Sequence, residues 1–213
     1  MPPVRCRMEW KANMVLFPAF LKLQGRPLLI VGGGAIAEQK LDGMIEAEAL
    51  ITLVAPQITP AIREIARAGS IQWIAREFRR SDLNRTFLVI AATGNPRVNE
   101  EIFREADRRN ILCNAVDEPE RCHFYYGSVV RRGDLQIAIS TNGKSPALAQ
   151  RLRKEFETLI DGTYAEWLEW LGRVRTLYIN RRVQREQRVR ALHHLASRPV
   201  FERYRQREVS HHG

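Results

Sequence analysis

The sequence predicts an α/β fold: a doubly wound parallel sheet, followed by a β-hairpin and a C-terminal helical region. Short apolar runs alternate with segments of helical periodicity, as in sheets whose parallel strands are joined by crossover helices. These runs lie at 28–31, 50–54, 70–75, 87–92 and 111–116. A glycine-rich turn directly follows the first run, which is typical of such sheets. After residue 118 the alternation stops and hairpin spacing begins.

The glycine turn predicts a nucleotide-binding site. Residues 32–37 read GGGAIA, which is G-x-G-x-x-A spacing between a strand and a helix expected over 35–48. Gly32 would permit the tight turn, and Gly34 would let the backbone approach phosphates. The N–H groups and the dipole at a helix N-terminus attract an anion. We therefore expect a dinucleotide pyrophosphate here, in a Rossmann-type domain over 1–118.

The ribose end of this site departs from the usual pattern. An Asp or Glu about 20 residues after the glycines normally receives the ribose hydroxyls, but here the second strand is followed by Ala55, Pro56 and Gln57. Backbone groups or Gln57 would then hold the adenosine ribose. Because no Arg follows directly to bind a 2′-phosphate, the sequence favours NAD over NADP.

Other polar residues follow strands of the same sheet. Thr93 and Asn95 come after the run at 87–92, and Asp117 comes after the run at 111–116. Ligands of doubly wound sheets bind beyond the carboxyl ends of the strands. We therefore expect these side chains at the same edge as the glycines.

The region from 119 to 145 predicts a hairpin and a loop. We expect strands at 123–130 and 135–140, joined by a turn at 131–134. A polar loop then leads to Ser145. This region is no longer a repeat of strand and helix.

The region from 146 to 213 predicts helices. Thr59-Pro60 earlier in the chain and Ser145-Pro146 here are typical helix starts, each with an N-cap followed by a first-turn proline. Helical periodicity continues almost to Ala196, with an apolar stripe through Trp167, Leu171, Val174 and Tyr178. Such a stripe needs another surface to bury it, so we expect a second small domain or a dimer interface.

Composition limits the class of protein. The 213 residues are 45% hydrophobic, which is ordinary for a globular chain of one domain with an appendage or of two small domains. No apolar run approaches the ~20 residues of a membrane helix, and no signal peptide precedes the sheet, so we expect a cytoplasmic protein that does not bind membranes. Cys6, Cys113 and Cys122 lack C-x-x-C spacing, which indicates neither a disulfide framework nor a zinc site, and we expect Cys113 in the core.

The net charge of +10 is concentrated in one segment. Residues 173–208 hold eleven Arg and three Glu, a net charge of +8, so the rest of the chain carries only +2. The charge therefore says little about the ligand of the nucleotide site. An Arg-rich helical tail is compatible with a nucleic-acid or protein partner, but we find no DNA-binding motif and do not expect nucleic acid.

Four stretches resemble, in order and spacing, the precorrin-2 dehydrogenase/sirohydrochlorin ferrochelatase family, which forms the dehydrogenase module of siroheme synthase. They are VGGGAIAEQK, LVIAATGNPRVNEEI, NAVDEP and VVRRGDLQIAISTNGKSPALAQRLR. The resemblance covers about residues 17–157. It implies NAD binding in a Rossmann domain, a homodimer formed through the hairpin and helices, and oxidation of precorrin-2 to sirohydrochlorin. Many members then insert Fe²⁺ to give siroheme.

The resemblance also implies site residues. The dinucleotide contacts fall on the glycine turn and on the exit of the second strand, with Thr93 on the same edge: Gly32, Gly33, Gly34, Ala35, Ile36, Pro56 and Gln57. The carboxylate of the N-x-V-D motif, which begins at Asn114, falls on Asp117. This Asp would serve as general base in dehydrogenation and would orient the metal transiently in chelation. The alternative is an Asp that only closes a turn before Pro119.

Further candidates would contact a carboxylate-bearing tetrapyrrole. Ser140, Thr141 and Lys144 offer hydroxyl and ammonium donors, although capping and loop solvation explain such residues as well. His123 and Asn114 lie close to Asp117 in sequence, and a histidine at the entry to a hairpin is also compatible with a structural or solvated role.

Two residues depart from the family pattern. Glu48 stands where E-A-G-A usually ends a helix with glycine, and Asn142 replaces the first glycine of the S-x-G-G-x-S-P loop. The first change affects a helix end. The second leaves substrate and metal preference open.

A different class of function competes with the enzyme. A dinucleotide-sensing regulator, with an Arg-rich tail that binds a partner or nucleic acid, would share the glycine turn and the basic helices. A dehydrogenase without chelatase activity is a narrower alternative. Turnover of precorrin-2 with NAD separates the enzyme from the regulator, and insertion of Fe²⁺ or Co²⁺ into sirohydrochlorin decides the narrower alternative.

Overall fold

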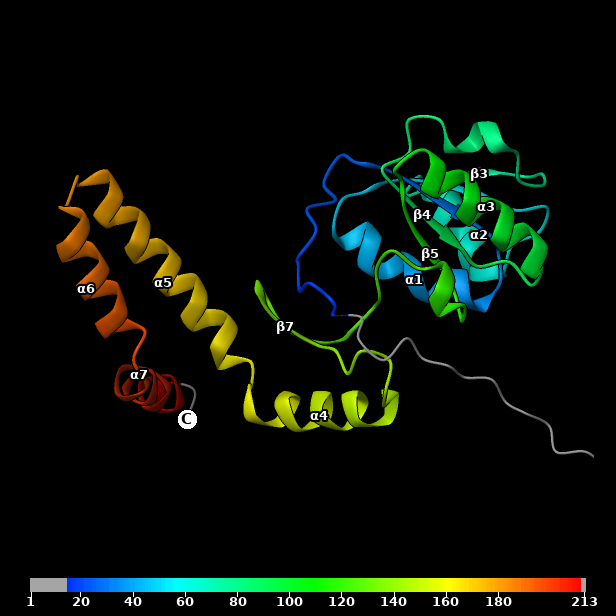
Figure 1. Cartoon of the computed structure of the whole chain (residues 1–213). Coiled ribbons are helices and arrows are strands. Elements are labelled where there is room, and N and C mark those ends of the chain that lie inside the picture. Colours follow the sequence, from blue (N-terminus) through cyan, green and yellow to red (C-terminus); the bar gives the residue numbers. More distant parts are fainter. Residues whose placement is uncertain (1–14, 212–213) are drawn as a thin grey trace, which may run out of the picture. The chain divides into compact units, whose positions relative to one another are not determined.

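The computed structural model describes the backbone of residues 15–211 and the side chains of 15–206, so Cys6 lies outside the described residues. The chain divides into two compact units, one over 17–126 and one from Gly127 onward. The first unit holds the parallel sheet, and the second holds the hairpin and the C-terminal helices (Figure 1).

The first unit is built on a parallel sheet in the order β3-β2-β1-β4-β5, in which every neighbouring pair is parallel. Its strands are β1 (Pro27–Val31), β2 (Leu50–Val54), β3 (Gln72–Ile74), β4 (Leu88–Ala91) and β5 (Leu112–Ala115). The chain runs outward from β1 to β3 and then returns to the other side of β1. This order confirms the predicted doubly wound fold and sets the topological switch point between β1 and β4.

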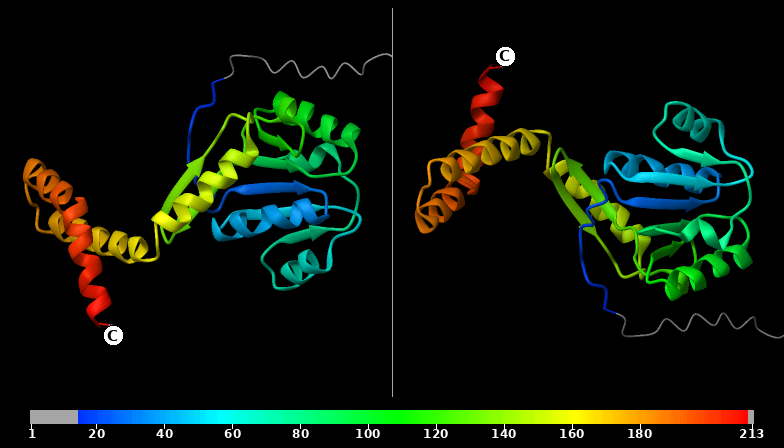
Figure 2. Two further views of the ribbon diagram at one scale, coloured as in Figure 1. Left: turned by 90° about the horizontal axis from the view of Figure 1, so that it is seen from below. Right: turned by 90° about the horizontal axis from the view of Figure 1, so that it is seen from above.

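Helices cover both faces of this sheet, which explains why the strands are continuously apolar. Alternate strand residues face opposite sides. Leu28 and Ile30 pack with α1 (Ala35–Glu46) and α2 (Pro60–Arg67), whereas Leu29 and Val31 pack with α3 (Pro96–Arg108) and η1 (Arg80–Leu83). The two views of Figure 2 show these helices around the sheet.

The buried stripe of α1 begins one position after Ile36. Ala37, Leu41 and Met44 are buried, at the i, i+4, i+7 spacing of one helix face. Ile36 is 41% exposed, because it precedes Ala37 by one residue and a step of one residue rotates a side chain by about 100° around the helix axis. Ile36 therefore lies at the open end of the glycine turn rather than in the core.

Both predicted N-caps are confirmed. The Thr59 hydroxyl accepts a hydrogen bond from the Ile62 N–H at 3.2 Å, and the Ser145 hydroxyl accepts one from the Leu148 N–H at 3.2 Å. Each satisfies one of the backbone donors that a helix start leaves unpaired, a contribution of about 1 kcal/mol.

The hairpin is formed by β6 (Ser128–Arg132) and β7 (Leu135–Ile139), which pair in antiparallel orientation. Its turn is shorter than expected, because Arg131 and Arg132 pair within β6 and only Gly133 and Asp134 connect the strands. Gly133 has φ +56°, the left-handed conformation that tight hairpin turns require. The first strand also begins later than predicted, because Cys122 forms an antiparallel bridge to Asn114 instead.

The remainder of the second unit is helical but interrupted, whereas the periodicity indicated one continuous stretch. The helices are α4 (Pro146–Leu159), α5 (Thr163–Asn180), α6 (Arg185–Leu195) and α7 (Arg198–His211). Part of the apolar stripe of α5 packs against α7. The ring centroids of Trp167 and Phe201 lie 4.7 Å apart, and those of Tyr164 and Phe201 lie 4.2 Å apart. Within the part of the chain that the structure describes, no helix is long and apolar enough to cross a membrane.

The segment before β1 forms no strand. The apolar pattern of residues 16–23, LFPAFLKL, is compatible with a strand or turn against the sheet, yet these residues have no regular secondary structure. Phe17 and Phe20 are 89% and 70% exposed, and only Leu23 packs against the core. Pro18 removes one backbone donor, which disfavours pairing of this segment as a strand.

Candidate active site

The first two glycines of the turn are required by the fold itself. Gly32 has φ +116°, and a Cβ there would lie 2.2 Å from the Ala92 carbonyl oxygen. A Cβ on Gly33 would lie 2.2 Å from the Gln57 carbonyl oxygen. The Gly33 carbonyl accepts a hydrogen bond from the Thr59 N–H at 3.0 Å. The glycine turn is therefore fixed against the loops that follow β2 and β4.

The third glycine faces open space. Gly34 is the N-cap of α1, and a Cβ built on it meets no atom within 4 Å. No side chain caps this helix end, and Ala35 and Ile36 in its first turn are exposed. The first N–H groups of a helix have no acceptor within the helix. Open space in front of these donors fits a dinucleotide pyrophosphate.

The exit of β2, residues 55–57, contains no acidic residue. The Trp73 indole N–H donates to the Ala55 carbonyl oxygen at 3.0 Å, and Pro56 and Gln57 are exposed beside the glycine turn. Glu38 accepts a hydrogen bond from the Thr59 hydroxyl at 2.6 Å. This edge can hold a ribose with backbone groups and the Gln57 amide.

Arg76, which follows β3, the strand paired with β2, already binds a carboxylate. Arg76 follows β3, whose last residue, Ile74, accepts a hydrogen bond from the Ala55 N–H at 3.3 Å. The Arg76 guanidinium donates to both carboxylate oxygens of Asp82, at 2.8 and 2.6 Å. Burial alone would raise the pKa of Asp82, but the hydrogen bonds from Arg76 and from the Arg79 N–H outweigh burial and lower it. The pair therefore stays charged and mutually satisfied.

A buried amide that the sequence analysis missed organises the carboxyl edge between β4 and β5. Asn99 is only 4% exposed, and its Oδ1 accepts a hydrogen bond from the Thr93 hydroxyl at 2.6 Å. Its Nδ2 donates to Glu118 at 3.0 Å, and Glu118 forms an ion pair with Arg121. The sequence signal that could have revealed Asn99 is its polar side chain on the stripe of α3 that faces the core. Thr93 is consequently fixed at the edge, as expected, by its bond to Asn99.

Asp117 lies directly beyond β5, at the same edge as the glycine turn. It adopts φ +61°, a left-handed conformation that Asp tolerates better than most residues, and its side chain is exposed. The Asp117 carboxylate has no hydrogen-bond partner within the described part of the chain. An exposed carboxylate at this edge can receive a proton from a bound ligand.

The structure does not bring Asn114 and His123 to that edge. The buried Asn114 amide donates to the Phe124 carbonyl at 2.8 Å. His123 lies at the amino end of β5, where its Nδ1 accepts a hydrogen bond from the Cys113 N–H at 3.1 Å and its Nε2 lies 3.2 Å from Asp107. Both side chains hold the segment that returns alongside β5.

The other expected substrate residues belong to the second unit. Ser140, Thr141 and Lys144 lie in the loop between β7 and α4. The Ser140 hydroxyl accepts from the Asn142 N–H, and the Thr141 hydroxyl accepts from the Ser145 N–H, each at 3.2 Å. Lys144 is exposed. The loop is thus locally ordered and presents one cation.

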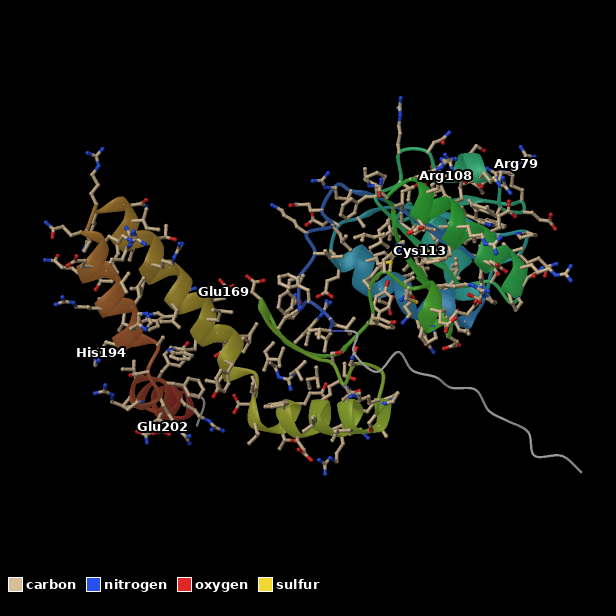
Figure 3. The ribbon with its side chains drawn as sticks, viewed as in Figure 1. Arg79, Arg108, Cys113, Glu169, His194 and Glu202 are labelled. Carbon is tan, nitrogen blue, oxygen red and sulfur yellow. The ribbon has the colours of Figure 1, made fainter. Side chains whose placement is uncertain are left out.

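Metal-binding clusters are absent from residues 15–206, where no three His, Cys, Asp or Glu side chains gather as a set of ligands. Cys113, labelled in Figure 3, is fully buried, and burial raises the pKa of its thiol to about 12. It is a core residue, as expected.

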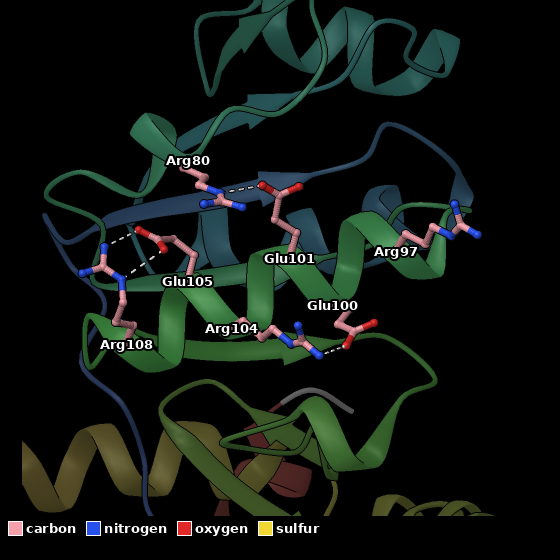
Figure 4. A pocket seen from close by; sticks show the side chains of 7 residues that line it. All are labelled: Arg80, Arg97, Glu100, Glu101, Arg104, Glu105 and Arg108. Carbon is pink, nitrogen blue, oxygen red and sulfur yellow. Dashed lines mark hydrogen bonds and ion pairs between the residues drawn. The ribbon is translucent and has the colours of Figure 1, made fainter.

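A surface depression along α3 is formed by ion pairs (Figure 4). Arg80 pairs with Glu101 at 2.6 Å, and Arg104 pairs with Glu100 at 2.5 Å. Among the residues that the structure describes, each charge lining the depression has a partner close by, except Arg97. Exposed pairs of this kind contribute about 0–1 kcal/mol each and offer no enclosed ligand site.

Known proteins share this fold. A solved structure titled "SirC, precorrin-2 dehydrogenase" superposes with a TM-score of 0.74 and 26% identity, covering 90% of this chain and 98% of that chain. Two family profiles also match: one described as putative NAD(P)-binding over residues 19–128, and one described as sirohaem biosynthesis protein central over residues 132–159. The chain belongs to the precorrin-2 dehydrogenase and siroheme synthase family.

Curated members of the precorrin-2 dehydrogenase and siroheme synthase family are longer than this chain. Siroheme synthase 1 of Serratia proteamaculans is 39% identical over 162 residues, which are 76% of this chain and 34% of that protein. Siroheme synthase of Methylobacillus flagellatus is 43% identical over 151 residues, 71% of this chain and 32% of that protein. The chain thus spans about a third of the length of the curated relatives it matches.

The two departures from the pattern of this family fall at left-handed backbone positions. Glu48 has φ +54° and Asn142 has φ +53°, which explains why glycine is expected at both. Asn tolerates this conformation well, so the loop before α4 keeps its shape. Glu48 tolerates it less well, and its carboxylate accepts a hydrogen bond from Gln24 at 2.8 Å.

Proposed function

We propose that this protein oxidises precorrin-2 to sirohydrochlorin with NAD as the hydride acceptor. The observation that carries the proposal is the position of Asp117 at the same sheet edge as the glycine turn. The fold in which this occurs aligns with 98% of a chain titled precorrin-2 dehydrogenase. The NAD(P)-binding profile over 19–128 supports the same class of cofactor.

The reaction removes one hydride and one proton from the macrocycle. When bound, NAD supplies C4 of its nicotinamide as the hydride acceptor. The Asp117 carboxylate accepts the proton as general base, because it is exposed and lies beyond β5 at the ligand-binding edge. The protein thus contributes binding, orientation and one proton acceptor.

The cofactor contacts follow from the geometry of the carboxyl edge. The pyrophosphate binds the N–H groups at the start of α1, and the adenosine ribose binds the exit of β2. The residues concerned are Gly32, Gly33, Gly34, Ala35, Ile36, Pro56 and Gln57, with Thr93 beside them. The engagement of Arg76 by Asp82 supports NAD over NADP, because it leaves that guanidinium paired rather than available to a 2′-phosphate.

The second unit supplies the remaining substrate contacts in this proposal. Ser140, Thr141 and Lys144 offer hydroxyl and ammonium donors to the carboxylates of the tetrapyrrole. Asn114 and His123 act by holding the segment alongside β5 rather than by contacting the substrate. The hairpin and the helices after it form the contact of a homodimer, and the protein acts in the cytoplasm.

Insertion of Fe²⁺ into sirohydrochlorin is a second candidate activity. Relatives named siroheme synthase support it. Asp117 would then orient the incoming ion and accept pyrrolic protons, with Fe²⁺ as a substrate.

The test is to incubate the purified protein with precorrin-2 and NAD⁺ and to follow the absorbance of NADH and of sirohydrochlorin. We expect one NADH for each sirohydrochlorin formed. Absence of turnover, together with salt-sensitive DNA binding, would favour the dinucleotide-sensing regulator instead. A second assay, with Fe²⁺ or Co²⁺ and sirohydrochlorin, decides whether the protein also inserts a metal.

A further inference from the structure

One arginine at the carboxyl edge of the sheet has no role in the proposed mechanism. Arg97 lies in the first turn of α3, which follows β4 through the loop that contains Thr93 and Asn95. Because this loop leaves β4 at its carboxyl end, Arg97 lies at the edge where ligands of doubly wound sheets bind. Its side chain is exposed, and its backbone N–H donates a hydrogen bond to the Asn95 side chain at 3.0 Å.

The Arg97 guanidinium has no anion because the neighbouring carboxylates bind other arginines. Residues three and four positions further along a helix are those that could pair with it. Glu100 pairs with Arg104 at 2.5 Å, and Glu101 pairs with Arg80 at 2.6 Å. Figure 4 shows Arg97 extending away from both pairs, at the N-terminal end of the helix. Over residues 15–206, no carboxylate lies within ion-pair distance of Arg97.

A free cation in this turn is unfavourable for the helix itself. The N-terminus of a helix carries a partial positive charge, so a cation there is repelled, whereas a bound anion is attracted. The only intrahelical partners within reach of Arg97 are already neutralised, as described above. An anion supplied by a ligand would therefore satisfy both the guanidinium and the helix end.

Two contacts hold the first turns of α3 against the turn that carries Asp117. The Asn99 amide donates to the Glu118 carboxylate at 3.0 Å, and Glu118 is the residue after Asp117. The Glu100 carboxylate lies 3.5 Å from the Arg121 guanidinium, which belongs to the same turn region. The free cation and the candidate base thus belong to two adjoining segments of one edge, which are anchored to each other by these side chains.

We propose that Arg97 binds a peripheral carboxylate of the tetrapyrrole substrate beside Asp117. This inference rests on the proposed dehydrogenation. Carboxylate side chains surround the macrocycle, so a macrocycle that Asp117 deprotonates brings one of them over the adjoining start of α3. A guanidinium can form two parallel hydrogen bonds with a carboxylate, which fixes the orientation of the ligand as well as contributing affinity.

The other anion at this edge is the pyrophosphate of the cofactor, which the proposed mechanism assigns to the start of α1. That helix packs with Leu28 and Ile30 on one face of the sheet, whereas α3 packs with Leu29 and Val31 on the opposite face. The start of α3 is therefore on the side away from the pyrophosphate. This separation favours the substrate over the cofactor as the partner of Arg97.

Steady-state kinetics of Arg97→Gln in the full chain test this inference. We expect the KM for precorrin-2 to rise on the order of 10- to 100-fold, the usual loss when a hydrogen bond to a charged group is removed. The kcat should stay unchanged, because the contact is made equally in the ground state and the transition state. The KM for NAD and the unfolding midpoint should not fall or rise with it, which a merely structural arginine would not produce.

Two further variants make the result specific. Arg97→Lys retains the charge but loses the two-pronged geometry, so its KM for precorrin-2 should lie between those of the wild type and Arg97→Gln. Arg104→Gln is the matched control, because Arg104 is an exposed arginine of the same helix that already binds Glu100. Its KM for precorrin-2 should equal that of the wild type.

Each failure has its own signature. An unchanged KM for precorrin-2 in Arg97→Gln would overturn the inference, and a rise in the KM for NAD in its place would assign Arg97 to the cofactor and overturn it as well. Both results leave the proposed function intact. Absence of turnover in the wild type would instead contradict the proposed function.

Binding of sirohydrochlorin, followed by its absorbance, tests Arg97 without any turnover. The dissociation constant should be larger for Arg97→Gln than for Arg104→Gln and the wild type by the same factor as the KM. Equal dissociation constants in the three proteins would overturn the inference, whatever the outcome of the turnover assay.

Discussion

The Asn99 amide donates a hydrogen bond to the Glu118 carboxylate at 3.0 Å, which connects the first turns of α3 to the turn that follows β5. The oxygen of the same Asn99 side chain accepts a hydrogen bond from the Thr93 hydroxyl, beyond β4. Two neighbouring carboxyl ends are therefore joined by one buried side chain. Asp117 is the residue before Glu118, so this amide also limits where the candidate base can lie.

Replacement of Asn99 by Leu should destabilise the protein by about 1–3 kcal/mol, because Thr93 and Glu118 lose a buried hydrogen-bonding partner. Urea unfolding measures this change. Turnover should fall more than the folded fraction does, since the turn that carries Asp117 loses an anchor. An unfolding midpoint equal to that of the wild type would mean that water replaces the amide without cost.

Asp117→Ala should lower kcat for dehydrogenation by about 10²–10⁴-fold, the usual contribution of a general base. NAD binding should be retained, because the glycine turn does not contact this side chain. Steady-state turnover and NAD titration of the same preparation check both parts. Normal turnover would remove Asp117 from the catalytic role and favour its alternative role as a turn residue.

The sequence predicted those elements that interactions between neighbouring residues determine. Four buried apolar strands, the left-handed Gly32 and the N-caps at Thr59 and Ser145 each follow from a few adjacent residues. The start of the first hairpin strand was misjudged because the return segment at 122–124 pairs with β5 instead of with its own hairpin. Such competition between distant segments leaves no local signature.

The candidate site was predictable to the same extent. The glycine turn, Thr93 and Asp117 share one edge because parallel strands bring their carboxyl ends together. His123 is close to Asp117 in sequence, yet the chain reverses between them and carries it to the other end of β5. A polar residue on the buried stripe of α3 marks Asn99 as unusual, but its partners Thr93 and Glu118 lie on other elements and could not be assigned from the sequence.

The glycines of the turn should separate folding from cofactor binding. Gly34→Val has open space for its side chain and should leave stability almost unchanged, but the new methyl groups would occupy the place of the pyrophosphate and abolish NAD binding. Gly33→Ala is the matched contrast, because its Cβ would lie 2.2 Å from a backbone oxygen and should destabilise the fold. NAD titration and thermal unfolding of both variants test this. Unchanged NAD affinity in Gly34→Val would reduce the glycine motif to a plain turn.

Glu48→Gly should stabilise the protein. Glu48 has φ +54°, and a left-handed non-glycine residue costs about 1–2 kcal/mol. Part of the gain is offset because glycine loses more conformational entropy on folding, which leaves a net increase of about 0.5 kcal/mol in the free energy of unfolding. The exposed bond from Gln24 contributes little. A lower urea midpoint in this variant would show that the bond to Gln24 outweighs the backbone strain.

Acid should weaken the protein through Glu105, a buried carboxylate on α3. The hydrogen bond from Arg108 is the largest cause and lowers its pKa, burial opposes this effect, and Arg109 adds a second hydrogen bond, which together bring the pKa of Glu105 from 4.5 to about 2. Because the folded-state pKa lies below the unfolded one, the stabilisation is complete above pH 4.5 and is lost as the pH falls toward 2. Glu105→Gln removes the titrating group while retaining most of the volume. The difference in unfolding midpoint between wild type and this variant should therefore be constant at neutral pH and should narrow steadily as the pH falls from 4.5 toward 2. A difference that is unchanged at the acidic end would contradict the role of Glu105 in acid sensitivity.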